Sequence, residues 1–126
     1  MQPPTEFLTP EEAAEVDKAL MTSHDKFATR VAIYALRSLK QIALQNNTAI
    51  ENLNSAQIED WVYQDESLQQ GIDREFKQFF SHLVISSQTP LKRAAEEAGV
   101  AIEGLDVAQV VAWFERNAKR KLEQEK

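Results

Sequence analysis

Histidines and carboxylates are the residues of this sequence best suited to acid–base or metal chemistry, and their spacing favours neither. His24 and His82 are the only histidines, and they fall in different predicted helices. The acidic pairs are adjacent in sequence, so their carboxylates diverge on a helix, unlike residues three or four apart. The chain also lacks cysteine, a glycine-rich phosphate loop and an HExxH motif. We therefore predict a protein that is not an enzyme and has no catalytic residue, cofactor or metal.

Cations recur at helical spacing in the segment 26–50, which contains no acidic residue. At about 100° per residue they share one helix face with Ile33 and Leu44, opposite a wide apolar face. Such a face is expected for solubility alone. The alternative is that it docks on an acidic surface, either the chain's own N-terminal helix or a second chain. We call the five candidate partner-binding residues the basic stripe: Arg30, Ile33, Arg37, Lys40 and Leu44.

The segment 91–121, LKRAAEEAGVAIEGLDVAQVVAWFERNAKRK, resembles the helix-turn-helix of DNA-binding proteins. Ala95, Gly99 and Val100 have the spacing usual in that motif, and a basic tail follows. The turn from Gly99 to Asp106 is longer than in the motif, whose second helix reads bases. As the alternative function, the resemblance implies a small DNA-binding regulator. Its candidate nucleic-acid contacts are Lys92, Arg93, Gln109, Arg116, Lys119, Arg120 and Lys121.

The elements that carry these residues are predicted to be helices. Thr9 and Glu12 form a capping box around Pro10, so a helix is predicted over 10–21 with Val16 and Leu20 facing inward. Cap residues and apolar periodicity predict further helices over 22–46, 54–63, 65–85, 89–99 and 107–122. The helix over 22–46 has the widest apolar face and should be central.

The sequence also predicts where two of these helices end. The chain should break at 86–90, because Pro90 disfavours a helical conformation in the residue before it. Gly99 should end the helix over 89–99 in a left-handed conformation. The last helix is predicted to place a set of apolar residues together on one face: Val107, Val110, Val111, Phe114, Ala118 and Leu122.

An internal duplication is the strongest signal in the sequence. Residues 49–62, AIENLNSAQIEDWV, and residues 101–114, AIEGLDVAQVVAWF, align without a gap at an offset of 52, with seven of fourteen positions identical. The aligned residues Trp61 and Trp113 are predicted to anchor a short helix onto a long one. Two related helical-hairpin units could stack so that each covers the other's apolar face.

Length and charge narrow the remaining possibilities. With 126 residues and 43% hydrophobic residues, the chain suits one domain over 1–126. We divide it into a flexible N-terminus over 1–9, a first repeat unit over 20–64, a second over 72–116 and a basic helical tail over 117–126. A net charge of −6 disfavours nucleic acid and anionic membranes as partners. No signal segment or membrane span is evident, so we expect a cytoplasmic protein.

These observations predict an all-α fold, a compact bundle of five or six helices built from two related hairpin units and an N-terminal helix. The predicted function is that of a non-catalytic interaction, regulatory or adaptor protein. Its partner is expected to be a protein of unknown identity, and a homodimer is one form of that interaction.

Overall fold

The computed structural model describes residues 8–65 and 74–124, which form five α-helices and two short 3₁₀ helices. In chain order these are α1 (Pro10–Lys18), α2 (Ser23–Gln45), η1 (Ile50–Asn52), α3 (Ser55–Gln64), α4 (Arg74–Ala98), η2 (Ile102–Gly104) and α5 (Val107–Gln124). The described residues contain no strand, so the predicted all-α bundle is confirmed. Most of the predicted flexible N-terminus and the first part of the helix predicted over 65–85 lie outside the described residues.

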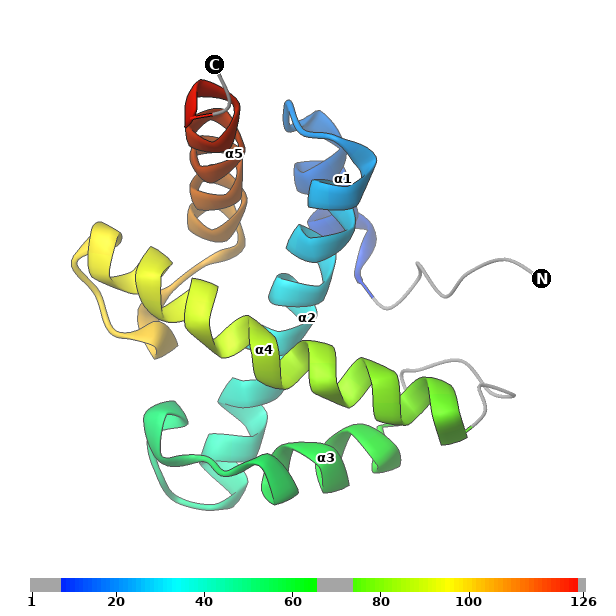
Figure 1. Cartoon of the computed structure of the whole chain (residues 1–126). Helices are drawn as coiled ribbons and strands as arrows, with labels where there is room; N and C mark the ends of the chain where they lie inside the picture. Colours follow the sequence, from blue (N-terminus) through cyan, green and yellow to red (C-terminus); the bar gives the residue numbers. More distant parts are fainter. Residues whose placement is uncertain (1–7, 66–73, 125–126) are drawn as a thin grey trace.

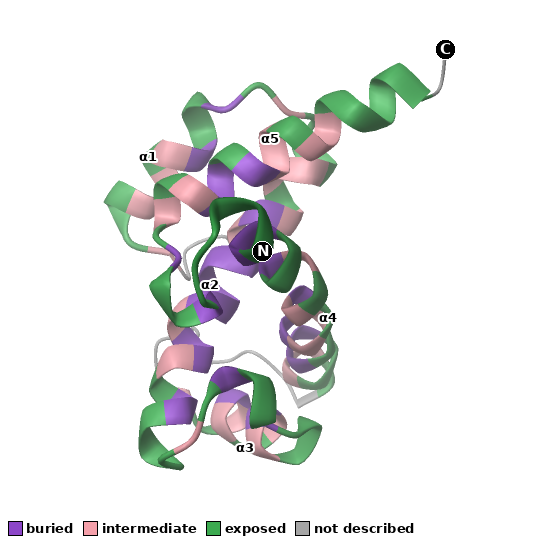
Figure 2. Cartoon of the chain, turned by 90° about the vertical axis from the view of Figure 1, so that its left-hand side faces the viewer, coloured by how far each residue is buried: buried purple, intermediate pink, exposed green. Residues whose placement is uncertain are grey.

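Helix α2 is the central element, as its wide apolar face predicted. It contacts the other four α-helices and both 3₁₀ helices. In Figure 1, α1 and α5 lie at one end of the molecule, whereas α3 and the first half of α4 lie at the other. Buried residues follow α2 and recur along the helices around it (Figure 2). The largest of them on α2 include Tyr34, Leu39 and Ile42, each at most 1% exposed.

Helix α1 begins with the predicted capping box and ends earlier than predicted. The Thr9 hydroxyl accepts the Glu12 N–H at 3.2 Å, and the Glu12 carboxylate accepts the Thr9 N–H at 2.9 Å. Val16 is fully buried, as expected. The prediction that Leu20 faces inward is wrong, since this side chain is 79% exposed. The helix stops at Lys18 and Ala19 is extended, so Leu20 no longer follows the helical face.

Helix α4 continues through Pro90, so the predicted break at 86–90 is wrong. Proline inside a helix removes one backbone hydrogen bond and costs about 3 kcal/mol. Burial continues on both sides of it, at Val84 and Ser87 before Pro90 and at Leu91 after it. Because α4 packs on both α2 and α3, a break would uncover apolar surface along two interfaces. Tertiary packing therefore overrides the local preference of Pro90.

Helix α5 starts at Val107, as predicted, and extends past the helices that cover its first turns (Figure 2). Val110, Val111 and Trp113 are buried, whereas Leu122 on the same predicted face is 64% exposed. The bundle therefore buries only the first part of this apolar face. Figure 2 shows the last turns of α5 coloured as exposed and extending beyond the other helices.

The two halves of the sequence alignment have the same local backbone structure. The backbone is left-handed just after α2 at Asn47, with a φ of 51°, and just after α4 at the aligned Gly99, with a φ of 70°. The residue after each donates its N–H to the carbonyl five residues back, Thr48 to Ala43 and Val100 to Ala95, both at 3.0 Å. This is the hydrogen bond of a Schellman motif. The predicted end at Gly99 is confirmed, and Asn47 takes the same conformation without being glycine.

The turns that follow also match. A 3₁₀ helix begins at Ile50 in one segment and at Ile102 in the other, and each isoleucine is buried. Reciprocal capping bonds then start the next helix, between Asn54 and Gln57 at 2.9 Å and between Asp106 and Gln109 at 2.8 and 2.9 Å. These shared bonds support the hypothesis of two related units, whose boundaries stay a prediction.

The short helix of each predicted unit packs on the long helix of the other. Helix α3 lies along α4, and α5 lies against α2. This crossed arrangement is the one in which each unit covers the other's apolar face. None of the described helices is long and apolar enough to cross a lipid bilayer.

Candidate partner-binding surfaces

The cations at the start of the basic stripe face the acidic helix α1. Arg30 Nη2 lies 2.9 Å from Asp17 Oδ1, and Arg37 Nη1 lies 3.4 Å from Glu12 Oε1. Lys26, one turn before Arg30, donates to the Asp17 carbonyl at 3.1 Å. Ile33 lies between the two arginines in sequence and is 1% exposed. The acidic surface that these residues contact is therefore the chain's own N-terminal helix.

The same Glu12 carboxylate caps α1 and pairs with α2. Its Oε1 accepts the Thr9 N–H and also faces the Arg37 guanidinium. The Glu12 side chain is only 13% exposed, so this ion pair is partly shielded from water. A shielded pair is screened less by salt than a pair on the open surface. Glu12 thereby links the start of α1 to the middle of α2.

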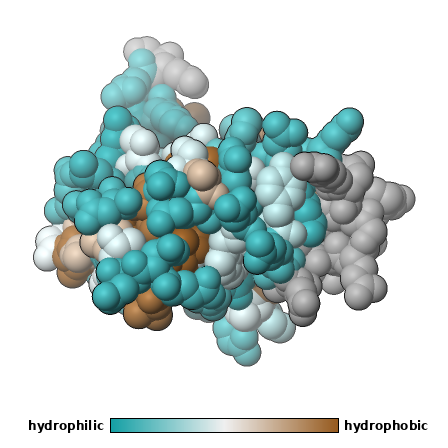
Figure 3. Space-filling view, turned by 90° about the horizontal axis from the view of Figure 1, so that it is seen from below, coloured by the Kyte–Doolittle hydropathy of each residue, from teal (hydrophilic) through white to brown (hydrophobic). Residues whose placement is uncertain are grey.

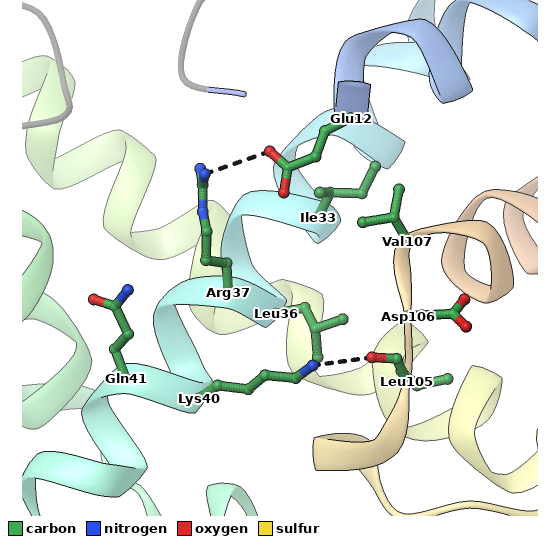
Figure 4. Close-up of a pocket in the computed structure, with 9 residues that line it drawn as sticks. All are labelled: Glu12, Ile33, Leu36, Arg37, Lys40, Gln41, Leu105, Asp106 and Val107. Carbon is green, nitrogen blue, oxygen red and sulfur yellow. Dashed lines mark hydrogen bonds and ion pairs between the residues drawn. The ribbon is translucent and has the colours of Figure 1, made fainter. Parts of the chain in front are cut away.

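A hollow of about 470 Å³ opens beside this ion pair, between α2, Glu12 and the end of η2. In Figure 4, Ile33 and Val107 face each other on one side of it, Leu36 lies nearer Lys40 and Leu105, and Arg37, Lys40 and Gln41 project from α2. Lys40 Nζ donates to the Leu105 carbonyl at 3.0 Å. This bond places a cation at the carbonyl end of η2 and connects the turn over 101–105 to α2.

Leu44 is the one member of the basic stripe with a large exposed apolar side chain, at 81% exposure. It follows Ala43 near the end of α2, beyond the reach of α1. Figure 3 views the α3 end of the molecule and shows apolar side chains gathered in one area of a largely hydrophilic face. The stripe as a surface for a separate partner stays a prediction.

The two aligned tryptophans differ in burial. Trp113 is 3% exposed, and its indole N–H donates to Glu97 Oε2 at 2.6 Å. Glu97 also pairs with Arg120 at 3.0 Å, so a single carboxylate joins α4 to two turns of α5. The Trp113 hydrogen bond, followed by the Arg120 charge, lowers the pKa of Glu97 below its ordinary range. Both partners therefore favour the ionised carboxylate.

Trp61 is half-buried beside Tyr34, with ring centroids 6.4 Å apart. The Tyr34 hydroxyl donates a short hydrogen bond to the Asp65 carboxylate. Burial, reinforced by this bond, raises the pKa of Tyr34 far above its ordinary value. The hydroxyl is therefore neutral at every physiological pH and acts as a donor that fixes the end of α3 against α2.

The residues proposed to contact nucleic acid are distributed over α4 and α5. Gln109 uses its side-chain oxygen to accept the Asp106 N–H at 2.9 Å, as a helix cap. Arg120 pairs with Glu97, whereas Lys92 and Arg93 lie on α4, exposed. Val110 and Val111 in the first turns of α5 are buried, whereas Ala112, Arg116 and Lys119 are exposed, so contact of this helix with nucleic acid stays a prediction.

The two histidines lie on different helices, as predicted, and each lies beside a carboxylate. His24 is 94% exposed and lies 4.0 Å from Asp25, whereas His82 is 61% exposed and lies 3.8 Å from Glu59. In the described parts of the chain, no three histidine or acidic side chains come together as a metal site would need.

A second groove was not predicted from the sequence. It encloses about 740 Å³ between the turn that joins α1 to α2 and the last turns of α5. Residues 17–22, Asp25 and Lys26 line one wall, and Ala118, Lys119, Lys121 and Leu122 line the other. We call it the α1–α5 groove. The Leu20 N–H donates to Glu115 Oε2 at 3.3 Å and holds the two walls together. The only hint of this groove in the sequence is that Leu20 and Leu122 lie on the apolar faces of their predicted helices.

Residues 8–121 match the protein family described as NDH complex assembly factor CRR9. The chain belongs to this family. We found no match to the chain among curated proteins or among solved structures.

The match to the NDH complex assembly factor CRR9 family covers every described element except the end of α5. It includes α1, the basic stripe and the two aligned turns over 49–53 and 101–105, so these features lie within the family domain. Lys119 and Lys121 of the α1–α5 groove fall inside the match and Leu122 lies one residue beyond it. The family description does not support the alternative of a DNA-binding regulator.

Proposed function

We propose that this chain is a non-catalytic factor that assists assembly of the NDH complex by binding a protein component of that complex. The observation that carries the proposal is the family match over residues 8–121. An assembly factor acts by holding a subunit or intermediate, so it needs an exposed binding surface and no reacting group. The proposed partner is therefore a protein.

Surface chemistry supports a protein-binding role. Several large apolar side chains are well exposed on this small domain, among them Leu20 at 79%, Leu44 at 81% and Leu122 at 64%. Exposed apolar groups scattered singly are ordinary on soluble proteins, but leucines that share a groove indicate a contact site. Leu20 and Leu122 line the α1–α5 groove together.

The test is to remove the gene from the source organism and quantify the NDH complex by native gel electrophoresis and immunoblotting. We expect the mature complex to fall and incomplete subassemblies to accumulate, and the wild-type gene to restore the complex. A second multisubunit complex serves as the control and should be unchanged. Normal amounts of mature NDH complex in the deleted strain would refute the proposal.

A biochemical test addresses the partner directly. An affinity-tagged copy of the chain should recover subunits of the NDH complex from cells in which that complex is being assembled. Recovery should fall when assembly is complete, because an assembly factor binds intermediates and leaves the finished complex. Equal recovery of the finished complex would instead indicate a resident subunit and contradict the assembly role.

A further inference from the structure

The α1–α5 groove combines two apolar side chains that the fold leaves uncovered. Leu20 and Leu122 come from elements about 100 residues apart in sequence, and they are 79% and 64% exposed. Between them lie Met21, which is half-buried, and Ala118 of α5. The Leu20 N–H bond to Glu115 fixes the spacing of the two walls. The groove is therefore formed by two elements of the fold that contact each other.

One wall of the groove consists of the part of α5 that has no counterpart in the first predicted unit. At the offset of 52, Gln64, the last residue of α3, aligns with Arg116, but α5 continues to Gln124. The apolar row of α5 passes from Phe114 through Ala118 to Leu122 at intervals of four residues. Within the described residues, the bundle covers only the first part of this row. An apolar helix face that extends past its own domain is suited to a partner.

The rim of the groove is basic although the whole chain is acidic. Four lysines line the groove, Lys18, Lys26, Lys119 and Lys121, against Asp17 and Asp25 in the lining and Glu115, which bonds across it. Lys121 lies 3.8 Å from Asp25 with its side chain 61% exposed, and Lys18 lies 3.3 Å from Glu15 at 71% exposure. Such exposed pairs contribute little, so these lysines can turn to an incoming anion at small cost.

We propose that the α1–α5 groove binds an acidic amphipathic helix of a protein partner. The leucines of the partner helix would pack on Leu20 and Leu122, and its acidic residues would face Lys119 and Lys121. A helix suits the site because side chains three, four and seven positions apart project from one face, as the row along α5 does. The inference rests on the proposed function only for the identity of the partner as an NDH complex component.

The first test uses the full chain and a fluorescein-labelled peptide of about 18 residues, with leucines on one helical face and glutamates on the rest. Fluorescence anisotropy should give saturable binding to the wild-type chain. A peptide of the same composition in scrambled order should bind at least about tenfold more weakly, because its leucines cannot share one face. A version with lysine in place of glutamate should also bind more weakly. Equal binding of the three peptides would overturn the proposal.

Single substitutions then locate the site. Leu20→Asp and Leu122→Asp should each raise the Kd of the acidic peptide at least about tenfold, since each removes a large apolar contact. The matched control is Phe79→Asp, which changes a well-exposed apolar side chain on α4, outside the groove lining. It should leave the Kd within about twofold. Loss of binding in Phe79→Asp, with no loss in the groove variants, would place the helix on α4 and overturn the inference.

Charge reversal tests the rim. The double variant Lys119→Glu, Lys121→Glu should weaken peptide binding strongly at about 0.05 M NaCl and less at about 0.5 M NaCl, since salt screens exposed charges. Lys92→Glu, Arg93→Glu is the matched control, with two exposed cations on α4. Equal effects of the two double variants would mean that net charge alone drives binding and would overturn the proposal. Circular dichroism of each variant confirms that the helices remain.

Two other occupants give distinct results that would overturn the proposal. If the groove binds a second copy of this chain, the molar mass will rise with concentration and Leu122→Asp will abolish the rise. If it binds a lipid surface, the wild-type chain will sediment with vesicles of phosphatidylcholine and phosphatidylglycerol, and the groove variants will not. We expect a constant molar mass and no sedimentation.

Failure of this inference can be distinguished from failure of the assembly function. If tagged wild-type chain and both groove variants recover NDH complex subunits equally well, the assembly role stands and the groove is not the contact site. If the acidic peptide binds the groove but deletion of the gene leaves the NDH complex unchanged, the groove stands and the assembly role fails.

Discussion

The link between α1 and α2 through Glu12 gives a prediction that separates a hydrogen bond from a charge. Glutamine at position 12 can keep the capping bond to the Thr9 N–H, because both Glu and Gln complete a capping box. It loses the negative charge that faces Arg37 at 3.4 Å and the favourable charge at the start of α1. Alanine loses the capping bond as well. The two substitutions therefore differ by one hydrogen bond.

The magnitudes follow from the burial of the pair. Arg37 is 34% exposed and Glu12 is 13% exposed, so we take the upper part of the range for surface ion pairs, about 1 kcal/mol. The charge at the helix start adds a few tenths of a kcal/mol. Glu12→Gln should then lower the free energy of unfolding by about 1 kcal/mol. Glu12→Ala should lower it by about 2 kcal/mol, because a net hydrogen bond contributes about 1 kcal/mol more.

Urea unfolding followed by far-UV circular dichroism measures both variants, in low salt and in about 1 M NaCl. High salt should shrink the cost of Glu12→Gln and leave the difference between the Ala and Gln variants unchanged. A double-mutant cycle with Arg37→Ala should give a coupling of about 1 kcal/mol with Glu12→Gln. Equal costs for the Gln and Ala variants, or a coupling of zero, would refute the assignment of two roles to Glu12.

Three further predictions concern α3, α4 and α5. Trp113→Phe deletes the indole N–H that bonds Glu97, so the pKa of Glu97 measured by NMR titration should rise; an unchanged pKa would contradict the stated cause. Because folding lowers this pKa, the stability that ionised Glu97 contributes is present at neutral pH and is lost as the pH falls through the lowered value. Pro90→Ala restores one backbone donor inside α4 and should raise the free energy of unfolding by about 1–2 kcal/mol, whereas a loss on urea unfolding would mean that the proline ring is needed in packing. Asn54→Ala and Asp106→Ala each remove an aligned cap and should each cost about 1 kcal/mol on thermal unfolding, and a large inequality would contradict the equivalence of the two turns.

Local features were the part of the fold that sequence could predict. The capping boxes at Thr9 and Asn54 and the left-handed end at Gly99 depend on residues within one turn of each other. Their geometry is fixed by neighbouring side chains and backbone, so no knowledge of the packing is needed. The width of the apolar face of α2 likewise predicted its central position, because it counts the directions from which a helix must be covered.

Pro90 shows where local preference fails. The residue before a proline disfavours helix by a local clash, and the sequence pattern therefore predicted a break. The cost is a few kcal/mol, and it competes with burial along the whole length of α4 on α2 and α3. That burial is a sum over residues distant in sequence, including Val84 and Leu91 on either side of the proline. It cannot be evaluated before the partners of α4 are known.

The acidic partners of the basic stripe could be identified only once the relative placement of α1 and α2 was known. Glu12 and Asp17 are five residues apart on α1, whereas their partners Arg37 and Arg30 are seven apart on α2 and in the reverse order. This order requires α1 to run antiparallel to the start of α2, which follows from the short turn between them. The individual pairs follow from the packing of Val16 against the core, and helical periodicity alone could not choose between α1 and a second chain as the acidic surface.

The α1–α5 groove could not be predicted from helical periodicity, because the exposure of Leu20 and Leu122 depends on where α1 ends and where the contacts of α5 end. Helical spacing places Leu20 on the same face as Val16 and Leu122 on the same face as Ala118, and both would be covered if each helix and its neighbours continued. Helix α1 ends at Lys18, and the neighbouring helices no longer cover α5 at Leu122. The two side chains are thus left outside the core for different reasons, yet they line one groove. Two uncovered apolar side chains in one groove are suited to contact with a partner, and in the proposed assembly role that partner is a protein.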